Sequence, residues 1–450
     1  MAQAAGMGAD DARYLLTRTG FAPTPAEIAR YAVLSRDEGV EQILDGVRTA
    51  PDTALPKALD DYVPPVRMRT LSEDERRELN RLQLREKGME LRAWWLGEML
   101  HTSSPLTERM TLFWHNHFVS SQEKVKSAAL MLDQNLLLRR FAVGNFGVLL
   151  HEVSKDTAMM LYLDAASNRK GQPNENFARE VMELFTLGEG HYTESDIKEA
   201  ARAFTGWTID PATGLFEYRH RLHDDGVKTI FGRTGKFDGD DVLDLLLARP
   251  ETAQFISVKL WHEFGTPALS QADVDRVATA LRQSRYEMRP ALLALFTSDT
   301  FWAPSTRGAL AKSPVDLVVG ALRSMQVDAN DPMPYVRTLR QLGQDLFAPP
   351  NVKGWPGNDT WINTATLLSR KQFLDRLARS DRLGASLSGS TQMAVSDKGN
   401  VMSDWSGALG EAGLTPAQVL LVVPPVEADP RQRGAAGLRA LLLDPAYEVK

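Results

Sequence analysis

The 450-residue chain has no cysteine, no excess of basic residues and no long hydrophobic run. The absence of cysteine excludes disulfides, thiolate metal sites and cysteine nucleophiles. Acidic residues outnumber basic ones by 58 to 52 and are interleaved with them, so there is no basic stripe of the kind that binds nucleic acid. No stretch approaches the roughly 20 apolar residues of a membrane span. We therefore expect a soluble globular protein that binds no nucleic acid and does not cross a membrane.

Several familiar signals are also missing. The N-terminus, MAQAAGMGADDARYLL, has no basic segment followed by an apolar run, which predicts a cytoplasmic location by default. The glycines at 226, 232 and 235 have the wrong spacing for a phosphate-binding loop, and no GKS or GKT follows them. The serine-hydrolase motif GxSxG is absent. Nucleotide-binding loops and nucleophile-elbow hydrolases are therefore unsupported.

Helical periodicity and helix caps dominate what is present. We predict a mainly α protein, with one large helical body over residues 1–383. Within it, residues 208–237 are rich in glycine and lack helical periodicity, which predicts a small irregular or two-stranded β insertion. Residues 384–413 are rich in Ser and Gly and are expected to be flexible. Residues 414–450 are expected to form C-terminal helices that pack on the main body.

Residues 173–207, PNENFAREVMELFTLGEGHYTESDIKEAARAFTGW, read as two helices joined by a short turn. Asn174 is a suitable N-cap for the first helix, and Gly188 stops it. The apolar residues of this helix form one stripe facing a core, at Phe177, Val181, Leu184 and Phe185. The neighbouring stripe is polar and carries Asn176, Arg179, Glu180 and Glu183.

The polar stripe has two interpretations. Glu180 and Glu183 are spaced i,i+3, so a helix can offer both carboxylates to one cation or to a shared proton. Arg179 could neutralise one of them or hold an anionic substrate. In the structural interpretation, Arg179, Glu180, Glu183 and Arg202 form a buried network that ties the two helices together. The clustering of polar residues in one element favours a site, with Arg179, Glu180 and Glu183 as candidate catalytic residues.

Three histidines are candidate metal ligands or bases: His115, His117 and His223. On a regular helix, residues two apart point about 200° apart, so His115 and His117 can share a metal only if the helix ends near Asn116. Packing roles for the pair are equally supported. His223 precedes Asp224 and Asp225 in a loop, where either carboxylate could orient it as a base or ligand. A turn with a surface histidine is the alternative.

Four segments together resemble a bacterial family catalogued as domain of unknown function 1800. They are ERMTLFWHNHF at 108–118, residues 173–207, HDDGVKTIFG at 223–232 and PPNVKGWPGNDTWINTATLLSR at 349–370. The resemblance covers nearly the whole chain, from LLTRTGFAPTPAEI to LLLDPAYEVK. It implies no settled activity. Members of the family are often encoded beside an exported protein similar to alkaline phosphatases, which implies a protein partner and leaves joint export to the periplasm open.

The leading functional hypothesis is a metal-assisted enzyme, with hydrolysis favoured over oxidation. His115, His117, His223 and Glu183 would be the metal ligands, and Glu180, Glu183, Arg179 and His223 the catalytic residues. Imidazole and carboxylate ligands without cysteine suit zinc, manganese or iron. The alternative is a non-catalytic scaffold or binding partner, whose tryptophans in residues 349–361 bind the partner or pin the loop to the core. The substrate, small molecule or polymer, is not predicted.

Overall fold

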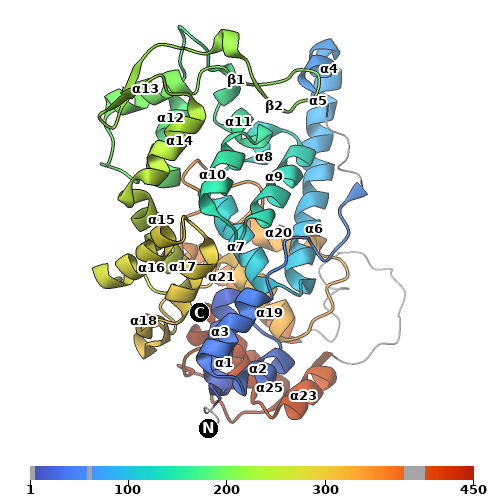
Figure 1. The fold of residues 1–450 in the computed structure, drawn as a ribbon. Coiled ribbons are helices and arrows are strands. Elements are labelled where there is room, and N and C mark those ends of the chain that lie inside the picture. The colour runs from blue at the N-terminus through green and yellow to red at the C-terminus, as the bar shows by residue number, and fades with distance from the viewer. Residues whose placement is uncertain (1–5, 58–62, 380–400) are drawn as a thin grey trace.

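A computed structural model of the chain describes residues 6–57, 63–379 and 401–450, and over these ranges the protein is mainly helical (Figure 1). The β structure in the described ranges consists of two small antiparallel sheets of two strands each. The predicted fold class is therefore confirmed. Of the helices in these ranges, none combines the length and the apolar character needed to span a membrane.

The N-terminal helices begin where their caps predict. Thr24 and Glu27 form a capping box, and Ser72 and Glu75 form another. The helix that begins after Ser72 is continuous to His101 but contains a π-helical segment. These elements are α1 (Gly8–Thr19), α2 (Pro25–Ala32), α3 (Arg36–Asp45), α4 (Pro65–Thr70), α5 (Glu73–Arg81), η2 (Leu82–Lys87) and α6 (Gly88–His101).

The central helices carry most of the candidate site residues. Asn174 caps the helix of the polar stripe, as predicted, and Thr193 and Asp196 form the capping box of the next one. The elements are α7 (Pro105–His117), α8 (Gln122–Val125), α9 (Ala128–Arg140), α10 (Phe146–Ser154), α11 (Thr157–Tyr162), η3 (Ala165–Ser167), α12 (Glu175–Glu180), η4 (Val181–Thr186) and α13 (Glu194–Ala203).

The β insertion lies where the sequence predicts it but contains two hairpins rather than one. Strand β1 (Trp207–Ile209) pairs with β2 (Phe216–Tyr218), and Trp207 lies opposite Tyr218. After the short η5 (His220–Leu222), β3 (Lys228–Ile230) pairs with β4 (Arg233–Gly235). Phe231 and Gly232, which connect β3 to β4, both have positive φ, so the tight turn uses a left-handed conformation that glycine adopts readily.

The remaining elements are again helical. They are α14 (Gly239–Ala248), α15 (Pro250–Phe264), α16 (Gln271–Gln283), α17 (Met288–Phe296), α18 (Asp299–Trp302), η6 (Pro304–Thr306), α19 (Pro314–Ser324), α20 (Met333–Gln341), η7 (Asn358–Trp361), α21 (Thr364–Arg379), α23 (Val401–Ala412), α24 (Pro416–Leu420), α25 (Gly434–Leu443) and η8 (Pro445–Glu448). Much of the segment expected to be flexible, 384–400, lies outside the described residues, and the rest of it is mostly helix α23.

Two large hydrophobic clusters form the core, and four helices contribute to both. Helix α7, for example, places Trp114 in one cluster and Leu112 in the other. Helices α1, α9 and α11 are shared in the same way. Helices α1–α3 lie beside the C-terminal helices at one end of the molecule, and α12–α14 lie with the first hairpin at the opposite end (Figure 1).

Candidate functional site

The helix that carries the polar stripe changes geometry between Glu180 and Glu183. Helix α12 ends at Glu180, and η4 is π-helical from Val181 to Thr186. The Leu187 N–H donates to Met182 O at 2.8 Å, five residues back, and the Thr186 hydroxyl donates to Val181 O at 2.6 Å. π-Helical turns are rare and occur often at functional sites, because they change where side chains point. The two glutamates therefore lie at an irregular part of the helix.

Glu183 is held by groups from two other segments. Tyr192, in the turn before α13, donates its hydroxyl to Glu183 Oε2 at 2.7 Å. Lys353 Nζ lies 3.9 Å from Glu183 Oε1 and 3.3 Å from Glu189 Oε1. Burial and the hydrogen bond to Glu183 raise the pKa of Tyr192, so it stays a donor at neutral pH. Glu183 is thus fixed in position beside a phenol and an ammonium group.

Glu180 has different surroundings, although it precedes Glu183 by only three residues. It is partly buried, and no hydrogen bond or ion pair reaches its carboxylate from the residues that the structure describes. Its pKa is raised, first by desolvation and then by the charge of Glu183, while Lys353 and Arg179 oppose the shift. Glu180 therefore keeps a proton to higher pH than an ordinary glutamate and has lone pairs free for a ligand. Glu180, Glu183, Tyr192 and Lys353 are called the carboxylate cluster below.

Lys353 reaches this cluster because its loop is fixed to the end of helix α7. The Trp355 N–H donates to Asn116 Oδ1 at 2.7 Å. Gly354 has a φ of +86° and is packed so closely that a Cβ there would lie 2.3 Å from Asn116 Oδ1. Only glycine meets both requirements. Two of the segments that carry the family resemblance, 108–118 and 349–370, therefore meet here and place Lys353.

Arg179 forms its ion pairs outside the carboxylate cluster. Its Nη1 and Nη2 each donate to Glu194 at 2.8 Å, and Glu175 lies 3.5 Å from Nη2. The bond to Glu194 raises the pKa of the guanidinium. Arg179 thus ties α12 to the start of α13, whereas Arg202 binds Asp224 and Glu199. The four-residue network of the structural interpretation does not form.

The structure separates the two histidines of helix α7, which continues regularly through both. The His115 ring packs 5.5 Å from those of Trp95 and Trp355 and 5.4 Å from that of Phe347. His117 Nε2 bonds to Phe185 O at 3.1 Å. Burial lowers the pKa of His115 to about 3 and that of His117 well below its usual value, so both are neutral. The two rings occupy different aromatic pockets.

His223 is buried under the β insertion. Its Nδ1 lies 2.8 Å from Thr205 O, and the Tyr218 ring is 5.7 Å away. Asp224, which could have oriented His223, instead accepts from Arg202 Nε at 2.9 Å, and this bond lowers the pKa of Asp224 to about 2. His223 is thus oriented by a backbone carbonyl, and its role as a base or ligand stays a prediction.

The donor set limits the metal chemistry that would fit. In the described parts of the chain, no three His, Asp or Glu side chains are grouped so that they could hold a metal ion. Catalytic zinc needs three protein ligands, and non-haem iron typically needs two histidines and a carboxylate. Glu180 and Glu183 alone fit a cation that retains several waters, as Mg²⁺ and Mn²⁺ do. The predicted set of His115, His117, His223 and Glu183 stays untested as a metal site.

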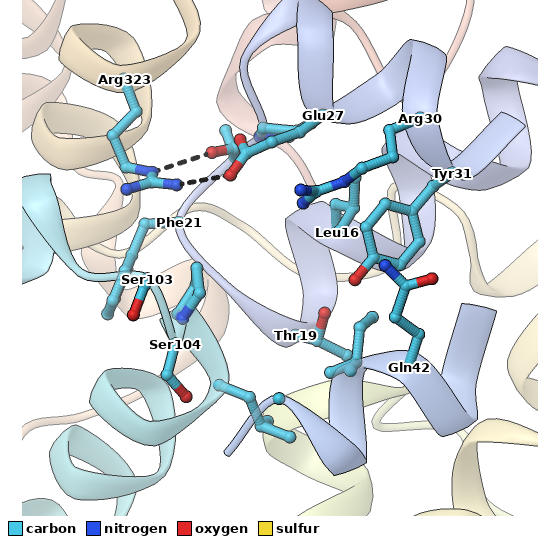
Figure 2. Close-up of a pocket in the computed structure, with 16 residues that line it drawn as sticks. Leu16, Thr19, Phe21, Glu27, Arg30, Tyr31, Gln42, Ser103, Ser104 and Arg323 are labelled. Carbon is cyan, nitrogen blue, oxygen red and sulfur yellow. Dashed lines mark hydrogen bonds and ion pairs between the residues drawn. The ribbon is translucent and has the colours of Figure 1, made fainter. Parts of the chain in front are cut away.

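Two small cavities lie elsewhere. One, of about 70 Å³, lies between α2, α3 and the start of α7; Arg323 closes one side by binding Glu27 at 3.2 Å (Figure 2). Another, of about 90 Å³, has Arg109, Asp316, Lys450 and Trp361 among its lining residues. Arg109 and Lys450 bind Asp316 at 2.5 and 2.7 Å. Both cavities have room for a few waters.

Sequence reasoning missed two members of the cluster, Tyr192 and Lys353. Tyr192 lies in the turn between the two predicted helices, so an antiparallel pair could have placed it near Glu183. Lys353 gave a weaker signal, because 170 residues separate it from Glu183. The only hint was the lysine's place in an irregular loop that also carries the family resemblance.

Comparison with known proteins identifies a family whose function is unknown. No curated protein matches the chain, and no solved structure matches it. One family model, described as a protein of unknown function (DUF1800), matches residues 14–449. Because this match covers nearly the whole chain, the protein belongs to the DUF1800 family.

Proposed function

We propose that the protein is a hydrolase that works by acid–base catalysis with the carboxylate cluster. Glu180 is the group that carries the exchangeable proton, and Glu183 is the ionised carboxylate held by Tyr192 and Lys353. The observation that carries this proposal is the asymmetry between two glutamates on one helix. Glu180 has a raised pKa and no partner among the described residues, while Glu183 accepts from Tyr192 at 2.7 Å. Pairs of carboxyl groups with such different surroundings serve as acid and base in many hydrolases.

The proposed roles follow from protonation. A glutamic acid with a raised pKa can protonate a leaving group and then accept a proton from water. Glu183 would act as the base or the stabilising anion, since Tyr192 and Lys353 hold its carboxylate in position. Arg179 would hold the helical hairpin through Glu194 rather than contact substrate.

A divalent cation is a second component of the proposal. In the cation-bound form Glu180 would be ionised and would no longer act as the acid. Glu180 and Glu183 would then be the two protein ligands, and the cation would supply a water of lowered pKa. The remaining ligands would be waters, which favours Mn²⁺ or Mg²⁺ over zinc. Lys353 is then the competing cation, because it lies 3.9 Å from Glu183.

The test is a panel of chromogenic esters, glycosides and phosphate esters, assayed with and without Mn²⁺. Wild type is compared with Glu180→Gln and Glu183→Gln. Glu194→Gln is the matched control, because it removes a carboxylate from the same hairpin outside the cluster. We expect hydrolysis to fall about 100-fold or more in the first two variants and to persist in the control.

A titration of Glu180 by ¹³C NMR gives a result that does not depend on finding a substrate. The carboxyl is expected to titrate above the range of the surface glutamates, and the Glu183→Gln variant should lower its pKa by removing the neighbouring charge. An ordinary pKa for Glu180, or hydrolysis that survives both cluster variants, would overturn the proposal.

A further inference from the structure

Lys259, on helix α15, differs from the other lysines whose pKa is lowered. Lys228 donates to Asp224 O at 2.5 Å and to Gly226 O at 3.1 Å, and Lys450 donates to Asp316. Lys312 lies over the Tyr447 ring, and the charges of Glu448 and Asp316 partly offset the lowering of its pKa by burial. Lys259 has no oxygen partner among the described residues. Its contact there is the Phe255 ring, 4.9 Å from Nζ.

The Lys259 ammonium group therefore has no hydrogen-bond acceptor among the described residues. Desolvation is the cause that lowers the pKa of Lys259, to about 8, so the group is still mostly charged at neutral pH. Glu263 lies one turn further along the helix but is directed to Arg109, 3.3 Å away. A partly buried cation with an unfilled shell is unfavourable unless something from outside completes it.

A second group beside Lys259 also lacks a partner. His117 is 3% exposed, and its Nε2 bonds to Phe185 O, which must accept, so Nε2 carries the hydrogen. Its Nδ1 is therefore a lone-pair acceptor, and it has no hydrogen-bond partner among the residues that the structure describes. The His117 ring lies 6.3 Å from that of Phe255, the ring under Lys259, and the charge of Lys259 contributes to lowering the pKa of His117.

His262 completes the group from the same face of α15, three residues after Lys259. It has no hydrogen bond or ion pair within the described ranges, and its pKa is lowered first by desolvation and then by the charge of Lys259. Its side chain lines the 90 Å³ cavity next to Asn116. The three side chains therefore offer one cationic donor, one buried acceptor and one neutral imidazole.

We propose that Lys259, His117 Nδ1 and His262 form a binding site for a small oxyanion that also carries a hydroxyl group. The oxyanion supplies the acceptor that Lys259 lacks, and the hydroxyl donates to His117 Nδ1. Hydrogen phosphate and 2-hydroxycarboxylates have both groups, whereas a simple carboxylate such as acetate has the oxyanion but no hydroxyl. The site does not depend on the carboxylate cluster and stands apart from the function proposed above.

The test is calorimetric titration of the whole protein near pH 8 with phosphate, lactate and acetate, each in two buffers of different ionisation enthalpy. Anion binding raises the pKa of Lys259, so protons are taken up and the observed enthalpy depends on the buffer. We expect millimolar binding of phosphate or lactate, and binding of acetate weaker by about tenfold. Whichever of the first two binds more tightly identifies the source of the anion.

The Lys259→Met variant should lose both the binding and the proton uptake, because it keeps the aliphatic packing on Phe255 without the charge. Lys155→Met is the matched control, since it removes an ammonium that is already paired with Asp240 at 2.7 Å. Glu180→Gln should bind as wild type does, which separates this site from the proposed hydrolase. Binding that survives in Lys259→Met, or no binding of phosphate or lactate to the wild type, would overturn the proposal.

Discussion

Arg139 and Glu108 form a buried ion pair whose members come from different helices. Arg139 on α9 is 1% exposed and forms a bidentate pair with Glu108 on α7, which is fully buried. The Trp95 indole donates to the same carboxylate at 2.9 Å. Such a pair adds little net stability compared with apolar residues, but loss of one partner leaves a charge buried alone.

The Glu108→Ala variant is accordingly expected to lose up to about 3–5 kcal/mol of unfolding free energy, because Arg139 loses its bidentate partner and keeps the more distant Glu98, 3.8 Å away. Glu175→Ala is the control, because the Glu175 side chain is 39% exposed and its carboxylate lies 3.5 Å from Arg179, a weak ion pair. This variant should lose less than about 1 kcal/mol of unfolding free energy. Urea denaturation followed by circular dichroism measures both. Equal shifts in the two variants would contradict this account.

Asp156 provides a pH-dependent test at the same scale. It caps α11 by accepting from the Met159 N–H at 2.9 Å and also accepts from Gln134 at 2.7 Å. Desolvation, assisted by the charge of Asp133, raises its pKa to about 7. Because the folded state holds the proton more tightly than the unfolded chain does, this contribution to stability is complete below about pH 4 and is lost as pH rises towards 7.

Asp156→Asn keeps an acceptor for both hydrogen bonds but cannot ionise. We expect the variant to match wild type in stability near pH 4 and to exceed it by on the order of 1–3 kcal/mol at pH 8. Thermal or urea denaturation across this range measures the difference. A constant difference between the two proteins at every pH would show that Asp156 does not titrate in this window.

At the scale of elements, caps and periodicity predicted most helices, but not their irregular parts. Asn174 starts its helix as expected, because a cap is a local interaction visible in the sequence. The π-helical segment η4 depends on bonds five residues back, which no periodicity of 3.6 can indicate. Lys353 lies near Glu183 because of the tertiary contact between Gly354 and Asn116. The sequence therefore predicted the two glutamates of the carboxylate cluster but not Tyr192 or Lys353.

Helices α10 and α14 are connected by a histidine that binds two carboxylates. His151 Nδ1 lies 2.9 Å from Asp240, and Nε2 lies 3.1 Å from Asp244. The bond to Asp240 raises the pKa of His151 and helps to lower that of Asp240 to about 2. Both ring nitrogens can donate only in the protonated form. The contribution to stability is therefore complete below about pH 6.5 and is lost as pH rises through the raised pKa.

His151→Ala should lower the unfolding free energy by about 0.5–1 kcal/mol at pH 6 and by less at pH 9, a modest effect because the carboxylates are largely exposed. His101→Ala is the control, since His101 bonds only to the Gly97 carbonyl. Denaturation at the two pH values measures the change. A loss in His151→Ala that is the same at both pH values would contradict the proposed titration.

At the scale of the whole molecule, the two hydrophobic clusters are joined by the helices that they share. Helix α1 contributes Leu15 to one and Ala12 to the other, and α9 contributes Leu138 and Met131 in the same way. The C-terminal helices belong to the second cluster through Trp405 and Leu441. Trp405 also donates to Ser324 O at 2.8 Å. Neither cluster can lose its packing without removing one face of each shared helix.

We therefore expect α10, in the first cluster, and α25, in the second, to unfold in one transition. Hydrogen exchange with mass spectrometry across a urea series measures peptides from both helices in the same sample. Their protection should be lost at the same urea concentration, and Leu112→Ala in the shared helix α7 should lower both midpoints together. If α25 lost protection at a lower urea concentration than α10, the clusters would be separate folding units, and the shared helices would not couple them.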